Sequence, residues 1–202
     1  MSDELIKKTL EAANLLKDWI IKAMASEKGV HVESVIAAAS RMAGTQIFRA
    51  VVPVNANAVA VGTPVFTEQA NSVGSNFMDL MLVTVQQLGN TINQETLMDI
   101  QKSGSVTTSL AHHSLLQTQE LIDPFYTALA RTQGFSDIDG ARAFVIAAAF
   151  LINDCKNVLD IHKGCSIAIH GLVEGAKTMP RSLTSNKNQS QQSKKSWYKF
   201  WQ

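Results

Sequence analysis

The sequence is short of charged residues and of cysteine, and each shortage excludes a class of protein. Charged residues make up 17% and hydrophobic residues 46% of the 202 positions, unlike the charge-rich, apolar-poor composition of a disordered chain. Two Cys cannot form the disulfide framework of a small secreted domain. A chain of this length buries roughly 70% of its unfolded surface and folds without one. The composition predicts one globular domain of closely packed helices.

The sequence also lacks a long apolar run. The longest, Ala143 to Ile152, has ten residues, whereas a membrane-spanning helix needs about 20. The N-terminal residues MSDELIKKTL carry acids and an amphipathic pattern where a signal peptide has a continuous apolar stretch. We therefore expect a soluble, cytoplasmic protein with reduced thiols.

Acidic residues are missing from the C-terminal end. None follows Glu174, whereas residues 181–202 hold five basic residues, which leaves 13 basic against 17 acidic residues in the body. Such asymmetry is typical of an interaction tail. The charge distribution argues against nucleic acid as a partner, because an acidic body offers no basic face and five basic side chains neutralise only a few phosphates.

The apolar spacing is helical along most of the chain. Helices are predicted over about 3–26, 31–51, 64–88, 94–102, from 107 onward, 136–158 and 161–178. Thr63-Pro64 is a favourable helix start, Ser136 with Asp139 resembles a capping box, and Asp123-Pro124 should kink or restart the fifth helix. The predicted fold is an all-α, single-domain bundle of about seven helices over 1–180, with a disordered C-terminal tail. The tail comprises a polar linker, 181–196, and an aromatic-basic motif, 197–202.

This terminal motif is the most informative feature of the sequence. Four of the 13 aromatic residues lie within five positions, where they contribute to no predicted core. Trp and Tyr anchor protein interfaces and favour membrane surfaces, while lysines favour anionic lipid. We expect docking to a partner protein or to an anionic membrane surface; folding back onto the protein's own domain is the alternative. The docking residues are Lys194, Lys195, Trp197, Tyr198, Lys199, Phe200 and Trp201.

A competing hypothesis is an interior pocket for a small molecule or lipid, in a binding protein or an enzyme. It draws on Gln46, which falls within an apolar helix face, and on the apolar stretch 54–62, which would be a lid. The candidate pocket residues are His31, Gln46, Arg49, Glu68, His113 and Glu120.

Polar residues of the second helix form a stripe, which in a bundle is expected to be the solvated face. Its members are His31, Ser34, Arg41, Thr45 and Arg49. Cys155 and Cys165 are expected to be buried free thiols. The small residues of the last helix, including Gly171 and Gly175, predict close approach of another helix, within the domain or across a homo-oligomer.

The sequence contains no convincing catalytic or metal-binding pattern. His31-x-Glu33 lacks the P-C-x-x-C that completes a zinc deaminase site, because the two Cys lie ten residues apart. His112 and His113 are adjacent and point about 100° apart on a helix. No cofactor or metal is predicted. The leading hypothesis is a non-enzymatic helical interaction or adaptor protein.

Overall fold

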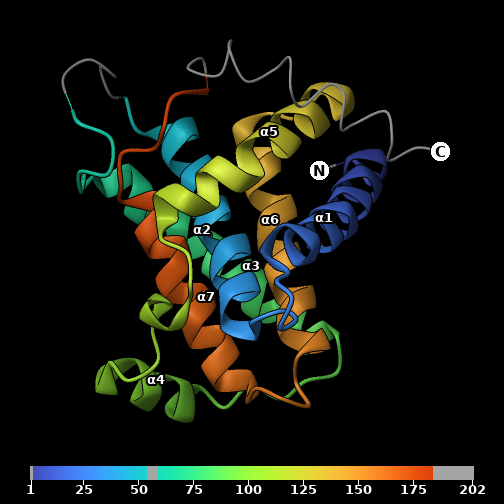
Figure 1. Ribbon diagram of the computed structural model, residues 1–202, viewed down its shortest axis with the longest axis vertical. Helices are drawn as coiled ribbons and strands as arrows, with labels where there is room; N and C mark the ends of the chain where they lie inside the picture. Colours follow the sequence, from blue (N-terminus) through green and yellow to red (C-terminus); the bar gives the residue numbers. More distant parts are fainter. Residues whose placement is uncertain (1, 54–58, 184–202) are drawn as a thin grey trace.

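Seven α-helices and one short 3₁₀ helix are found in the residues that the structure, a computed structural model, describes: 2–53 and 59–183 (Figure 1). The all-α prediction is confirmed. The elements are α1 (Asp3–Met24), α2 (Val32–Val51), α3 (Glu68–Gln87), α4 (Gln94–Ser103), η1 (Thr108–Leu110), α5 (Leu115–Gln133), α6 (Asp137–Asp154) and α7 (Ile161–Ala176).

Helix α2 lies at the centre of the bundle. Every residue from Ser34 to Phe48 is buried, because α6 and α7 pack closely against α2 and the other long helices, α1, α3 and α5, also contact it. Its many Ala residues allow neighbours to approach from all sides. In Figure 1, α4 lies at one end of the molecule beside the start of α7.

Glycines allow α2 and α7 to pack backbone against backbone. A Cβ on Gly44 would collide with the α7 backbone near Leu172, and one on Gly175 would collide with the α2 backbone near Arg41. Because Gly171 faces Ser40 and Gly175 faces Arg41, the two helices run in the same direction. The predicted close approach along α7 is therefore made within the domain.

Polar caps set several helix starts, as the sequence predicts. Ser136 and Asp139 form a capping box at α6, and Asp160 caps α7. The predicted start at Thr63-Pro64 is wrong: α3 begins after Thr67, whose hydroxyl accepts the N–H of Ala70. The earlier residues pair with the residues that follow α7, since Met179 donates to the Thr63 carbonyl over 2.9 Å.

Helix α5 begins later than predicted and continues through its proline. Ser114 provides its capping box, while residues 107–113 contain only η1. Pro124 lies inside the helix, so the predicted restart there is wrong. The Asp123 side chain is unavailable as a cap, because it pairs with Arg49.

Candidate functional site

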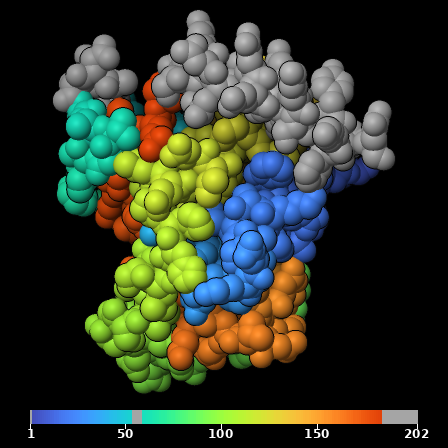
Figure 2. All heavy atoms as spheres, in the orientation of Figure 1, coloured from blue at the N-terminus to red at the C-terminus, as the bar shows by residue number. Residues whose placement is uncertain are grey.

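The polar stripe of α2 is buried, so the prediction that it is a solvated face is wrong. Ser34, Arg41 and Thr45 are all buried, because η1 and the first half of α5 lie across them. Figure 2 shows this yellow-green segment over α2, little of which reaches the surface on this face. We call residues 108–123 the cover segment, and the polar contacts that join it to α2 the polar seam.

Arg41 is the most connected residue of the polar seam. It is 5% exposed, and its Nε donates to Oε2 of Glu174 on α7 over 2.8 Å. Its Nη1 donates to the carbonyl of His113, and Nη2 lies 3.4 Å from the carbonyl of Thr108. The Thr108 hydroxyl donates to the same Glu174 carboxylate over 2.8 Å. One guanidinium thus joins α2, α7 and the cover segment, and its fork geometry suits this role.

Arg49 forms the second ion pair of the polar seam. Its Nη1 and Nη2 donate to the two carboxylate oxygens of Asp123, each over 2.8 Å, and both side chains are nearly buried. Tyr126 lies one turn further along α5, and burial, with the nearby Asp137 carboxylate, raises the pKa of its phenol. Burial also raises the pKa of Asp137, which the Arg49 charge partly opposes.

Neutral side chains complete the polar seam. The Gln119 amide donates to the Thr45 hydroxyl over 3.0 Å and accepts the backbone N–H of Arg181. The Arg181 side chain lies 3.3 Å from Glu120 at the surface. Arg181, predicted as the first residue of the polar linker, is therefore attached to the bundle.

A pair of stacked histidines lies at the beginning of α2. The rings of His31 and His112 have centroids 3.8 Å apart, and Nε2 of His31 lies 3.4 Å from Glu33. The Ser34 hydroxyl lies 3.0 Å from Nδ1 of His31 and accepts the N–H of His112. These contacts attach the middle of the cover segment to α2.

The six candidate pocket residues do not surround one cavity. Arg49 is paired with Asp123, and Glu120 is paired with Arg181. Nδ1 of His31 lies within hydrogen-bond distance of the Ser34 hydroxyl. Glu68 is exposed in the first turn of α3. The His113 ring is partly buried, and its Nδ1 has no hydrogen-bond partner among the described residues.

Gln46 is the exception among these candidates. Its side chain is wholly buried, and both amide atoms lack a hydrogen-bond partner within residues 2–53 and 59–183. A buried amide without partners is costly, and an internal water or a ligand usually satisfies it. The sequence located this residue through its position on an apolar helix face.

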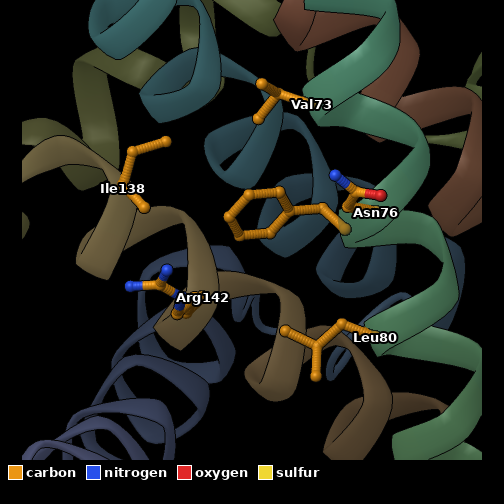
Figure 3. Close-up of a pocket in the computed structure, with 6 residues that line it drawn as sticks. Val73, Asn76, Leu80, Ile138 and Arg142 are labelled. Atoms are coloured by element: carbon orange, nitrogen blue, oxygen red, sulfur yellow. The ribbon is translucent and has the colours of Figure 1, made fainter. Parts of the chain in front are cut away.

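A pocket does exist, but at a place the sequence did not indicate. It lies between α3 and α6 and has a volume of about 280 Å³. Figure 3 shows Val73, Asn76 and Leu80 along α3, opposite Ile138 and Arg142 on α6. We call it the α3–α6 pocket. Its α3 residues and its α6 residues are at least 58 positions apart in the sequence, so helical periodicity alone cannot join them.

The predicted lid, 54–62, falls partly outside the described residues, which resume at 59. Gly62 donates to the carbonyl of Met179 over 2.8 Å, so the end of this stretch pairs with the chain after α7. The predicted docking residues 194–201 lie outside the described residues altogether.

Both cysteines are free thiols. Cys165 is buried as predicted, and burial together with the Asp160 charge raises its pKa to about 12. Cys155 is partly buried, and its pKa is raised by burial and by Asp154 and Glu33. Raised thiol pKa values oppose nucleophilic chemistry.

Two properties of the described residues bear on function. No group of three or more His, Cys, Asp or Glu side chains there is arranged to hold a metal ion. No helix in the same residues has the length and apolar character to cross a membrane.

Compared with protein-family models, curated proteins and solved structures, the chain matches none.

Proposed function

We propose that this protein is a non-enzymatic helical interaction or adaptor protein, which docks onto a partner protein or an anionic membrane surface through its C-terminal motif, 197–202. The observation that carries the proposal is the concentration of four aromatic residues and neighbouring lysines at the C-terminal end of the sequence. The chemistry of the body supports it, because the charged side chains of the polar seam are engaged in structural contacts.

The expected affinity is modest. Three lysines near an anionic surface contribute about 1 kcal/mol each, and partial aromatic burial adds a few kcal/mol. A total near −6 kcal/mol corresponds to a dissociation constant in the tens of micromolar. A single motif is therefore a reversible contact, and self-association of the body would increase the avidity.

The test compares the full chain with a version that ends at Lys194. Co-sedimentation with anionic and with neutral vesicles, and pull-down with the same two proteins, are measured at low and high salt. Loss of capture on truncation supports docking through the motif, and salt sensitivity restricted to anionic vesicles identifies lipid as the target. Equal capture by both versions would refute the proposal.

A matched variant separates aromatic from electrostatic contributions. Trp197→Ala with Trp201→Ala keeps every lysine of the motif and should weaken capture at all salt concentrations. Lys194→Gln with Lys195→Gln should weaken capture mainly at low salt. At high salt the ions already screen the attraction of the lysines, so their removal should change little.

A second candidate, a binder of a small apolar or anionic molecule, is favoured only by Gln46. Its unpartnered amide would orient a polar group of the ligand. A thermal-shift screen of metabolites and lipids tests this candidate, and a stabilising compound must lose its effect in Gln46→Leu. Stabilisation retained by that variant would place the ligand elsewhere.

A further inference from the structure

The α3–α6 pocket is suited to a single aromatic side chain. Its walls are mainly apolar, from Val73, Phe77, Leu80 and Ile138, and polar groups come from Asn76 and Arg142 (Figure 3). Its volume of about 280 Å³ is at the lower limit of small-molecule sites, which measure roughly 300–1,000 Å³. Apolar walls with a few polar groups suit the ring of Trp, whose indole N–H needs an acceptor.

The surroundings of the pocket favour a cationic ligand. No Lys or Arg occurs between Arg49 and Lys102, a stretch that contains all of α3. Asp79 is an exposed residue of α3 next to the lining residue Leu80, and the first turn of α6 carries Asp137 and Asp139. The positive charge of Arg142 is already paired with Asp139 over 2.7 Å. Because that pair is neutral, Asp79 and Asp137 are the acidic residues left to attract lysines.

After α7 the chain passes beside the approach to α3 and then reaches Arg181, whose carbonyl accepts a hydrogen bond from Arg49 over 3.2 Å. Hydrogen bonds from Val65 to the Lys177 carbonyl and from Met179 to the Thr63 carbonyl hold residues 177–179 beside the approach to α3. From its N-cap Thr67, the helix reaches Val73 after a rise of about 9 Å. A chain of 13 residues, the length of 184–196, has a root-mean-square span of roughly 20 Å and a maximum near 45 Å.

We propose that the α3–α6 pocket holds an aromatic side chain of the protein's own C-terminal motif, 197–202, with the flanking lysines beside the acidic residues. This contact rests on the proposed function and adds its regulation, since a partner or membrane has to compete for the same aromatic residues. Docking within one molecule is favoured because a linker matched to the span gives a millimolar effective concentration.

The contact has a measurable effect on capture. With an effective concentration of about 1 mM and an intrinsic dissociation constant of about 0.1 mM, the motif is docked in about nine molecules of ten. The apparent affinity for an external target is then about tenfold weaker than that of the free motif. A variant in which the pocket is blocked should therefore bind an external target about tenfold more tightly than the unsubstituted protein.

The test uses two substitutions on α3 in the full chain. Asn76 lines the pocket, whereas Ser75 is its exposed neighbour and does not line it. Asn76→Lys places a charge in the pocket that repels the lysines of the motif, and Ser75→Lys is the matched control with the same change of net charge. Both positions are exposed, so both variants should fold.

Fluorine NMR of fluorotryptophan-labelled protein reports the contact directly. The three Trp give three signals, assigned with Trp197→Phe and Trp201→Phe. In the unsubstituted protein we expect the chemical shift of Trp197 or of Trp201 to differ from its value in urea. In Asn76→Lys that signal should move to the urea value, whereas in Ser75→Lys it should stay where it is in the unsubstituted protein. Urea-like signals from both residues in the unsubstituted protein would overturn the inference, as would a response that disappears on dilution, because a second copy would then fill the pocket.

Vesicle and partner capture distinguish this inference from the function on which it rests. If both hold, Asn76→Lys binds about tenfold more tightly than the unsubstituted protein. If the signals show docking but no version captures a target, the inference stands and the proposed function fails. If capture depends on the motif but is equal in both α3 variants, the inference fails and the proposed function stands.

Discussion

Arg49 and Asp123 form a two-pronged ion pair between α2 and α5, with Nη1···Oδ1 and Nη2···Oδ2 distances of 2.8 Å each. Both side chains are about 10% exposed, so water can replace neither partner well. Arg49 also donates to the carbonyl of Arg181 over 3.2 Å. The pair therefore joins the central helix both to the cover segment and to the chain that follows α7.

Breaking this pair should be strongly destabilising. Asp123→Ala leaves the Arg49 guanidinium without its counter-charge in a nearly buried position, and we expect a loss of about 3–5 kcal/mol in the free energy of unfolding. Urea denaturation followed by circular dichroism measures the change. Glu11→Ala removes an exposed pair with Lys7 and should leave the midpoint unchanged. Similar midpoints for the two variants would contradict the structural role of Arg49 and Asp123.

Arg41 should hold the cover segment locally. Arg41→Met retains much of the side-chain volume but removes the hydrogen bonds to the carbonyls of Thr108 and His113 and to Glu174. Hydrogen exchange should accelerate in residues 104–114 more than in α6. Uniform acceleration across the bundle would show instead that the loss is global and that Arg41 has no specific hold on the segment.

The backbone contact between α2 and α7 should tolerate no side chain at Gly175. A Cβ there would overlap the backbone of α2 near Arg41 and Thr45, so Gly175→Ala should cost at least about 2–3 kcal/mol. Gly74→Ala is the matched control in α3, because its Cβ would meet only Leu172 Cδ2 at 3.7 Å. The control should be neutral or more stable by up to about 1 kcal/mol, since Ala favours helix. Equal losses would contradict the close packing of α2 on α7.

The cysteines should react slowly and unequally. Cys165 is buried, whereas Cys155 is partly exposed, so a thiol reagent should label one residue in the folded protein and two in urea. Cys155→Ser should abolish the labelling of the folded protein, and Cys165→Ser should leave it unchanged. The pKa of Cys155 is raised in the folded protein. The pH at which its labelling rate begins to rise should therefore be higher in the folded protein than in urea. Coincident pH profiles would contradict the raised pKa.

The sequence predicted several features that depend on neighbouring residues and missed those that depend on distant ones. The apolar spacing and the capping box of Ser136 and Asp139 are local, so the all-α fold and the start of α6 could be predicted. The caps Thr67 and Ser114 are local as well, but the stronger apparent starts at Thr63-Pro64 and Thr107 were chosen in their place. The burial of Arg41 could not, because its partners Thr108 and Glu174 lie far along the chain. Gln46 was located by its position on an apolar face, but its lack of a partner is visible only in the packed structure.

The polar seam also explains one failed assignment. A polar stripe on a helix has the same spacing whether it faces water or a polar partner. The deciding information lies in Gln119 and Asp123, both buried on α5, which form hydrogen bonds to Thr45 and Arg49 of α2. Recognising that two polar faces pair requires knowing which helices pack together.

Alkaline conditions should weaken the fold partly through Tyr126. Its phenol is buried against Phe144, its hydroxyl has no hydrogen-bond partner within the described residues, and its pKa is raised. The unfolded chain ionises this group near pH 10, whereas the folded protein keeps it neutral. The contribution of Tyr126 to stability is therefore fully present below about pH 10 and decreases as the pH rises above that value.

Tyr126→Phe isolates this contribution. The substitution removes an unpartnered hydroxyl next to Gly140, so its effect near pH 8 should be within about 1 kcal/mol of neutral. Above about pH 10 the unsubstituted protein should lose up to about 1.4 kcal/mol per pH unit more than the variant. Urea denaturation at several pH values between about 8 and 11 measures both curves, and Lys ionisation, common to the two proteins, cancels in their difference. Parallel curves over this range would mean that the phenol ionises as readily in the folded protein as in the unfolded chain, which its burial against α6 forbids.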